Sequence, residues 1–218
     1  MSTSDSFRLS RQTIAAAIVF VLVGSAACVA IAPAYMPDSY SWVEHSISES
    51  AGQGIENAWI ARLGFLLLGF GVLLTAWFVG SRWGMWGRLA HRVYGISMFA
   101  VAAFAHMPWE DVPYDSFEDS LHTVGAFGVG FGFTAGVLLV TFRRGADAGW
   151  IRWFDWFAIV AAFVIPMAMF NIEGIAGVVQ RVLFAIGYLW YGMEALPATD
   201  AASAEQQSEP AELVSSGA

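Results

Sequence analysis

The stretch Ala58–Gly80 reads AWIARLGFLLLGFGVLLTAWFVG, and Arg62 is its only charged residue. About 20 consecutive apolar residues are enough for a helix to cross roughly 30 Å of hydrocarbon. A backbone surrounded by lipid must satisfy its own hydrogen bonds, which favours a helix. The stretch therefore predicts a transmembrane helix.

Comparable apolar stretches recur along the 218 residues, of which 57% are hydrophobic and 13% charged. Soluble domains carry about 25% charged residues. We therefore expect an all-α polytopic membrane protein, a single bundle of six transmembrane helices at residues 14–35, 58–80, 89–107, 121–142, 153–170 and 175–194. Residues 1–13 are then a cytoplasmic N-terminal segment, 14–194 the transmembrane domain, and 195–218 a disordered cytoplasmic tail.

The first apolar stretch has an alternative interpretation. Arg8 and Arg11 precede it, and Ala30-Ile31-Ala32 resembles the cleavage site of a secretory signal. The apolar run is, however, about 19 residues long, which suits a membrane span better than a signal core. We expect it to be retained as the first helix.

Arginines predict the orientation. All ten basic residues are arginine, and eight of them lie before the first span, between the second and third, or between the fourth and fifth. With six spans these regions share one side, which the positive-inside rule makes cytoplasmic. We therefore expect a multi-pass protein of the plasma membrane with both termini in the cytoplasm and acidic loops outside.

Composition also excludes some functions. Without lysine, no Schiff base can form with a side-chain amine. A single cysteine, Cys28, allows no disulfide within the chain. A net charge of −8 does not favour nucleic acid as a partner.

Polar residues gather at the expected outer ends of the spans. Arg62 and Arg181 lie one or two turns inside spans, where a cation normally faces a partner or a wet cavity. Three of the four histidines lie at the same level, whereas His91 lies among cytoplasmic arginines and is expected to be solvated. We expect an outward-facing polar pocket formed by His45, Ser46, Ser48, Glu49, Arg62, His106, Asp119, His122, Glu173, Gln180 and Arg181.

Several of these residues also have a purely structural interpretation. Ser46-Ile47-Ser48-Glu49 fits a capping box that begins a short helix. Asp119 also lies close to a helix N-terminus, where a carboxylate is favourable. We expect residues 46–49 to form a short interfacial helix over the pocket, with His45 directed toward His122.

The pocket leaves several functions open, and the sequence does not decide whether the protein is an enzyme. The leading hypothesis is binding or handling of a lipid or small amphiphile, with Arg62 and Arg181 suited to an anionic headgroup. An alternative is a membrane-embedded metal-dependent hydrolase of a lipid amide or ester. Zinc is then possible, with candidate ligands His45, His106, Asp119 and His122. A small transporter or a structural membrane partner is the third hypothesis.

Two further patterns concern packing. Gly128, Gly132 and Gly136 recur every four residues, a spacing that lets another helix approach closely. This face is a candidate helix–helix contact, within the chain or with a partner. Tryptophans near the expected span ends fit an interfacial belt; they are Trp42, Trp59, Trp83, Trp86, Trp109, Trp150, Trp153 and Trp156.

The first outer loop carries a family resemblance. Ile47-Ser48-Glu49-Ser50-Ala51-Gly52 is similar to the "isSeLga"-like motif of the DUF998 family, with Ser50 at the usual leucine. Arg62-Leu63-Gly64-Phe65 follows in a glycine-rich apolar span. The resemblance implies a six-span membrane protein without an established activity.

Overall fold

Residues 10–145 and 149–196 are described in a computed structural model of the chain, and they are all-α, without a strand. Six long helices and two short ones follow one another. They are α1 (Arg11–Ile31), the 3-10 turn η1 (Ala32–Tyr35), α2 (Ile47–Ser50), α3 (Trp59–Phe78), α4 (Gly80–Ala103), α5 (Ser116–Arg144), α6 (Gly149–Asn171) and α7 (Ala176–Ala195). Residues 1–9 of the expected N-terminal segment (1–13) and residues 197–218 of the expected tail (195–218) lie outside the described residues.

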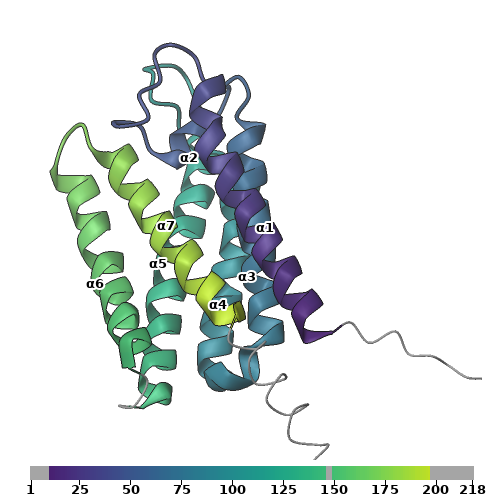
Figure 1. The fold of residues 1–218 in the computed structure, drawn as a ribbon. Helices are drawn as coiled ribbons and strands as arrows, with labels where there is room; N and C mark the ends of the chain where they lie inside the picture. The colour runs from purple at the N-terminus through teal and green to yellow at the C-terminus, as the bar shows by residue number, and fades with distance from the viewer. Residues whose placement is uncertain (1–9, 146–148, 197–218) are drawn as a thin grey trace, which may run out of the picture.

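The long helices form one closed bundle. Each packs against the next along the chain, and α7 packs against α1 to close the ring (Figure 1). Consecutive long helices run in opposite directions (Figure 1). The described chain consequently begins and ends at the same end of the bundle (Figure 1).

Four helical segments are long and apolar enough to cross a membrane: Arg11–Tyr35, α3, α5 and α6. α4 and α7 have comparable lengths, 24 and 20 residues, but more polar sequences. The structure therefore supports a membrane-embedded helical protein.

α4 begins nine residues earlier than expected, at residue 80 rather than 89. The sequence there is glycine-rich and contains Arg82 and Arg88, so low hydropathy made it look like a loop. Gly84 interrupts the helix with φ 70°, a conformation that glycine adopts without steric cost. The corrected boundary places Trp83 inside the bundle, 2% exposed, and not in the interfacial belt.

His91 is the second correction. It was expected to be solvated, but its ring is fully buried, stacked on Trp190 with ring centroids 4.8 Å apart. Its Nδ1 lies 2.9 Å from the Tyr191 hydroxyl. The ring fits because Gly136 on α5 has no side chain there; a Cβ would lie 2.7 Å from His91 Nε2.

The glycine face of α5 packs on α4 of the same chain. A Cβ on Gly132 would lie 2.7 Å from the Tyr94 nitrogen, and one on Gly128 would collide with Ser97. The expected close helix approach is therefore present, and α4 occupies it.

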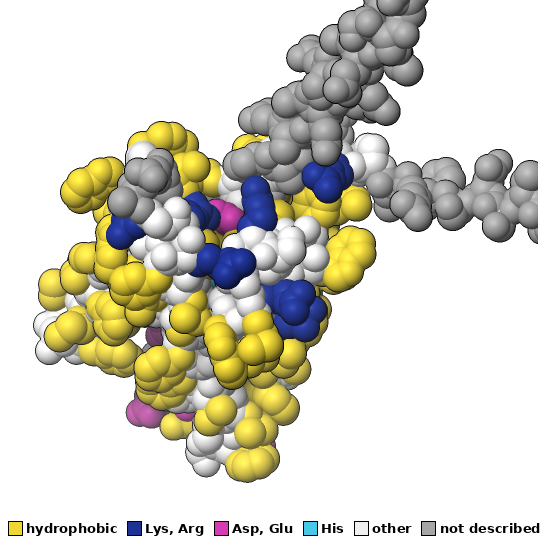
Figure 2. Space-filling view, turned by 90° about the horizontal axis from the view of Figure 1, so that it is seen from below, with side chains coloured by type: hydrophobic (Ala, Val, Ile, Leu, Met, Phe, Trp, Pro, Cys, Tyr) yellow, Lys and Arg dark blue, Asp and Glu magenta, His cyan; other side chains and the backbone are white. Residues whose placement is uncertain are grey.

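Arginine side chains gather at the end of the bundle that holds the termini, around an acidic side chain (Figure 2). We call it the arginine end; it carries Arg11, Arg82, Arg88, Arg92, Arg143, Arg144 and Arg152. The opposite end is formed by the longer connections, and we call residues 36–58 and 104–115 the cap (Figure 1).

Ion pairs at the arginine end involve two carboxylates that the sequence analysis did not single out. Arg144 pairs with Glu194 and, at 3.5 Å, with Asp155. Trp190 Nε1 donates to Asp155 Oδ1 at 2.8 Å. Asp155 is fully buried and Glu194 nearly so. Removing one partner of a buried pair costs about 3–5 kcal/mol, so these contacts hold α5, α6 and α7 together.

Two glycines test this packing. Gly187 on α7 is buried, yet, apart from its chain neighbours and the backbone of its own helix, no heavy atom of the described residues lies within 4 Å of where its Cβ would be. We expect Gly187→Ala to raise the free energy of unfolding by about 1 kcal/mol, because alanine has a higher helix propensity than glycine.

Gly136→Ala should lower the free energy of unfolding by about 1–3 kcal/mol, because the added methyl group collides with His91. Unfolding of both variants in the same detergent measures the difference; equal stability would contradict the described α4–α5 contact.

Candidate functional site at the cap

The cap is built around the short helix α2. Ser46 Oγ accepts a hydrogen bond from Glu49 N at 3.1 Å, and Glu49 Oε2 accepts one from Ser46 N at 2.5 Å. This is the capping box predicted from the sequence. Since four residues of helix are marginal alone, α2 depends on contacts with the bundle.

α7 supplies the first set of those contacts. Gln180 Oε1 accepts a hydrogen bond from Ile47 N at 2.5 Å. Arg181 donates to the carbonyl oxygens of Trp42 (2.9 Å) and His45 (3.2 Å) and to the Tyr40 hydroxyl (2.7 Å). Arg181 thus binds the chain that leads into α2.

Gly177 lets that chain come close. Its nitrogen donates to the Glu44 carbonyl at 3.2 Å, and a Cβ on Gly177 would lie 2.9 Å from the Val43 carbonyl oxygen. The backbone of the first loop therefore lies directly on α7.

Arg62 on α3 binds the chain that leaves α2. Its Nε donates to the Ala51 carbonyl at 3.0 Å and an Nη to the Gly52 carbonyl at 3.1 Å. Within the described residues, neither Arg62 nor Arg181 pairs with a carboxylate. The two arginines bind opposite ends of the same loop and do not converge on one anion site.

His45 belongs to an aromatic cluster. Its Nδ1 accepts a hydrogen bond from Ser41 N at 2.8 Å. Its ring lies 5.3 Å from that of Trp109 and 5.4 Å from that of Tyr40. None of the contacts described for His45 involves His122, so the expected direct approach of these two histidines is not seen.

His106, Asp119 and His122 do come together. His106 Nδ1 lies 2.7 Å from Asp119 Oδ1, which also accepts a hydrogen bond from Met107 N at 2.8 Å. The His106 and His122 rings stack with centroids 5.1 Å apart. Asp119 and His122 project from one face of α5, as their spacing predicts.

His122 connects α5 to α2. Its side chain is 2% exposed, with Nδ1 2.8 Å from the Phe104 carbonyl oxygen and Nε2 3.1 Å from Ser48 Oγ. A carbonyl only accepts, so Nδ1 carries the proton in the neutral imidazole. Nε2 is then the acceptor and the Ser48 hydroxyl is the donor.

Glu173 is separate from this network. It is exposed in the connection between α6 and α7 and makes no hydrogen bond or ion pair with another described residue. The predicted site residues thus fall into two groups. One is a cluster of His106, Asp119, His122 and Ser48. The other holds α2 in place and consists of Ser46, Glu49, Gln180, Arg62 and Arg181.

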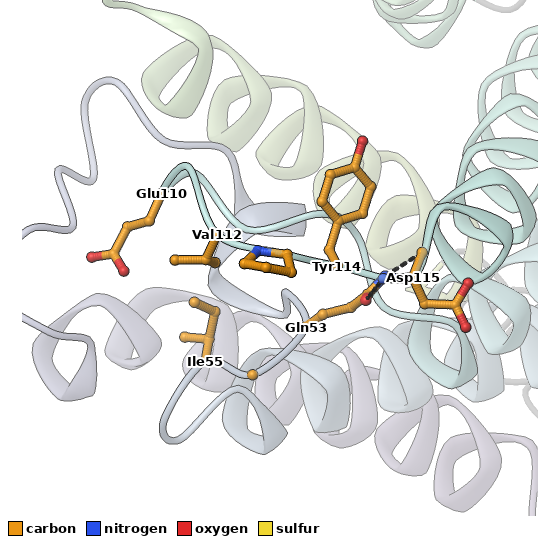
Figure 3. A pocket seen from close by; sticks show the side chains of 8 residues that line it. Gln53, Ile55, Glu110, Val112, Tyr114 and Asp115 are labelled. Carbon is orange, nitrogen blue, oxygen red and sulfur yellow. Dashed lines mark hydrogen bonds between the residues drawn. The ribbon is translucent and has the colours of Figure 1, made fainter.

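An open depression of about 670 Å³ lies in the cap. Figure 3 shows Ile55 and Val112 facing each other across it, with Glu110 toward one end and the hydrogen-bonded pair Gln53 and Asp115 toward the other. Gly54, Pro113 and Tyr114 complete the lining. The depression adjoins the backbone of His106, because Gln53 N donates to the His106 carbonyl at 2.9 Å.

The donor set does not form a ready metal site. Over residues 10–145 and 149–196, no group of three or more His, Cys, Asp or Glu side chains is placed to hold a metal ion. His45 lies in the aromatic cluster, and both nitrogens of His122 have protein partners.

Sequence reasoning missed most of the depression and the buried carboxylates at the arginine end. The depression is lined by two loops that are joined by hydrogen bonds between Gln53 and Asp115, 62 residues apart, and no local pattern reveals this pairing. Asp155 had a detectable signal, since a carboxylate inside an apolar run normally has a partner.

Comparison with known proteins identifies the family. A family model described as "Protein of unknown function (DUF998)" matches residues 14–196, most of the chain. The chain therefore belongs to this family. Neither a curated protein nor a solved structure matches significantly.

Arg181 tests how the cap is held. We expect Arg181→Met to lower the free energy of unfolding by about 2–3 kcal/mol, because the Trp42 and His45 carbonyls and the Tyr40 hydroxyl lose a charged donor. Cleavage by a protease should increase within residues 37–53. Arg92→Met, an exposed arginine on α4, is the control and should stay within about 0.5 kcal/mol of the wild type. If the protease cleaved the cap at the same rate in Arg181→Met and Arg92→Met, Arg181 would not be what holds the cap.

Proposed function

We propose that the protein spans the plasma membrane six times, with both termini in the cytoplasm. α4 and α7 complete the same ring as the four apolar helical segments and have spanning lengths. An even number of spans returns the chain to its starting side. The clustering of arginines at that end favours the cytoplasm there.

We further propose that the cap binds a lipid or small amphiphile at the outer face of the membrane. The observation that carries this proposal is the mixed lining of the depression. Ile55, Val112 and Pro113 offer an apolar surface, while Glu110 offers a carboxylate beside it.

The lining indicates what kind of headgroup fits. Glu110 Oε1 accepts a hydrogen bond from Ser39 at 2.7 Å, and the Asp115 carboxylate caps α5. Carboxylates only accept hydrogen bonds when ionised. A headgroup with hydroxyl or ammonium donors is therefore favoured over an anionic one, and Arg62 and Arg181 are already engaged with carbonyls.

Lipid analysis of purified protein in nanodiscs tests this function. The wild type should retain one class of lipid or amphiphile, enriched over the surrounding membrane. Val112→Asp should reduce that enrichment about tenfold or more, because a charge replaces apolar contact area, and tenfold corresponds to 1.4 kcal/mol.

Val43→Asp is the matched control. Val43 is an exposed valine of the same cap that does not line the depression. It should leave the enrichment unchanged. A lipid profile in the wild type that equals that of the bulk membrane would refute the proposal.

A metal-dependent hydrolase is a second proposal, favoured by the closeness of His106, Asp119 and His122. These side chains would exchange their present hydrogen bonds for zinc, which takes His and Asp ligands. Metal analysis of the purified protein tests it. Stoichiometric zinc that is lost in His122→Ala supports it, and folded wild-type protein that holds no zinc after purification in zinc-containing buffer refutes it.

A further inference from the structure

Three serines lie in and beside α2, and they have different partners. Ser46 Oγ accepts from Glu49 N, and Ser50 Oγ donates to the Ile47 carbonyl at 2.7 Å. Ser48 Oγ instead lies 3.1 Å from His122 Nε2. Ser48 is partly exposed, whereas Ser46 and Ser50 are buried. Of the three, Ser48 alone combines access with a histidine partner.

The histidine is held in one tautomer. The Phe104 carbonyl fixes the proton on Nδ1, so the lone pair of Nε2 is directed at Ser48. The His106 ring stacks on His122 and is itself held by Asp119. A serine, a base and a group that orients the base form the arrangement by which serine nucleophiles are activated.

If α5 spans the membrane as proposed, with its middle at the bilayer centre, its length sets the depth of the Ser48–His122 pair. α5 has 29 residues and is about 43 Å long, longer than the roughly 30 Å of the hydrocarbon core. His122 lies six residues from the start of α5, hence about 9 Å along it. This level is close to the boundary between headgroups and acyl chains.

We propose that Ser48 and His122 are the nucleophile and general base of an acyl-transfer site that acts on an ester of an amphiphile. The substrate class rests on the proposed amphiphile binding; the nucleophile assignment rests on the contacts of Ser48 and His122.

The reaction has two balanced steps. Ser48 Oγ attacks the ester carbonyl while its proton moves to His122 Nε2. The C–O bond to the alcohol breaks, and the alcohol leaves with that proton. Water then gives a proton to His122 and attacks the acyl-serine, which releases the carboxylic acid and restores the Ser48 hydroxyl. His106 and Asp119 act as positioning residues for His122.

An alkyl fluorophosphonate, which phosphonylates activated serines, tests the assignment on the full chain in nanodiscs. Mass spectrometry of peptides should find one adduct, on Ser48 of the wild type. Ser48→Ala should abolish it, and His122→Gln should slow its formation about 100-fold or more, the usual contribution of a general base. Ser120→Ala, at an exposed serine of α5, should leave the rate unchanged.

Two results would overturn the assignment, one from the wild type and one from the His122→Gln variant. Folded protein that forms no Ser48 adduct refutes it whatever the variants do, and so does an equal rate in folded His122→Gln. Retained lipid selectivity without an adduct refutes the acyl-transfer site and leaves amphiphile binding intact. An adduct without lipid selectivity supports the serine nucleophile and refutes the amphiphile as its substrate.

Discussion

Polar groups among apolar helices need partners within the chain, because lipid offers none. This constraint shapes both ends of the bundle. At the arginine end, Arg144 is neutralised by Asp155 and Glu194. At the cap, Arg62 and Arg181 bind backbone carbonyls, so that the first loop is fixed onto α3 and α7.

The contacts that fix the first loop determine which side chains remain available for a functional site. Because the two guanidinium groups are used for support, they do not offer an anion clamp in this arrangement. Because α2 is held against α5, Ser48 meets His122. The depression beside His106 adds a surface that is partly apolar and partly polar. The contacts that give the arginines their structural role also bring Ser48 to His122.

The sequence predicted the features that depend on local pattern. Long apolar runs predicted an all-α chain, the Ser46–Glu49 pattern predicted the capping box, and the spacing of Asp119 and His122 predicted a shared helix face. The six-span topology stays a prediction, since only four segments of the described residues have the hydropathy of a membrane span. Polar residues lower the hydropathy of α4 and α7.

What the sequence could not supply depends on contacts distant along the chain. His91 looked solvated beside Arg92, but it faces Gly136 and is buried. The sequence placed His45 and His122 at one level and suggested that they approach each other. In the structure the His45 ring stacks on Trp109, and His122 Nε2 lies near Ser48 Oγ. The position of a residue in the sequence gives its level in the bundle, but it does not show which neighbour its side chain contacts.

Sidedness is the central claim, and cysteine labelling of intact cells tests it most directly. Cys28→Ala removes the native thiol, and single cysteines then replace the exposed residues Arg11, Asp38 or Glu173. A membrane-impermeant maleimide should label Asp38→Cys and Glu173→Cys on intact cells, and Arg11→Cys only after permeabilisation. Labelling of Arg11→Cys and Asp38→Cys from the same side would contradict the account.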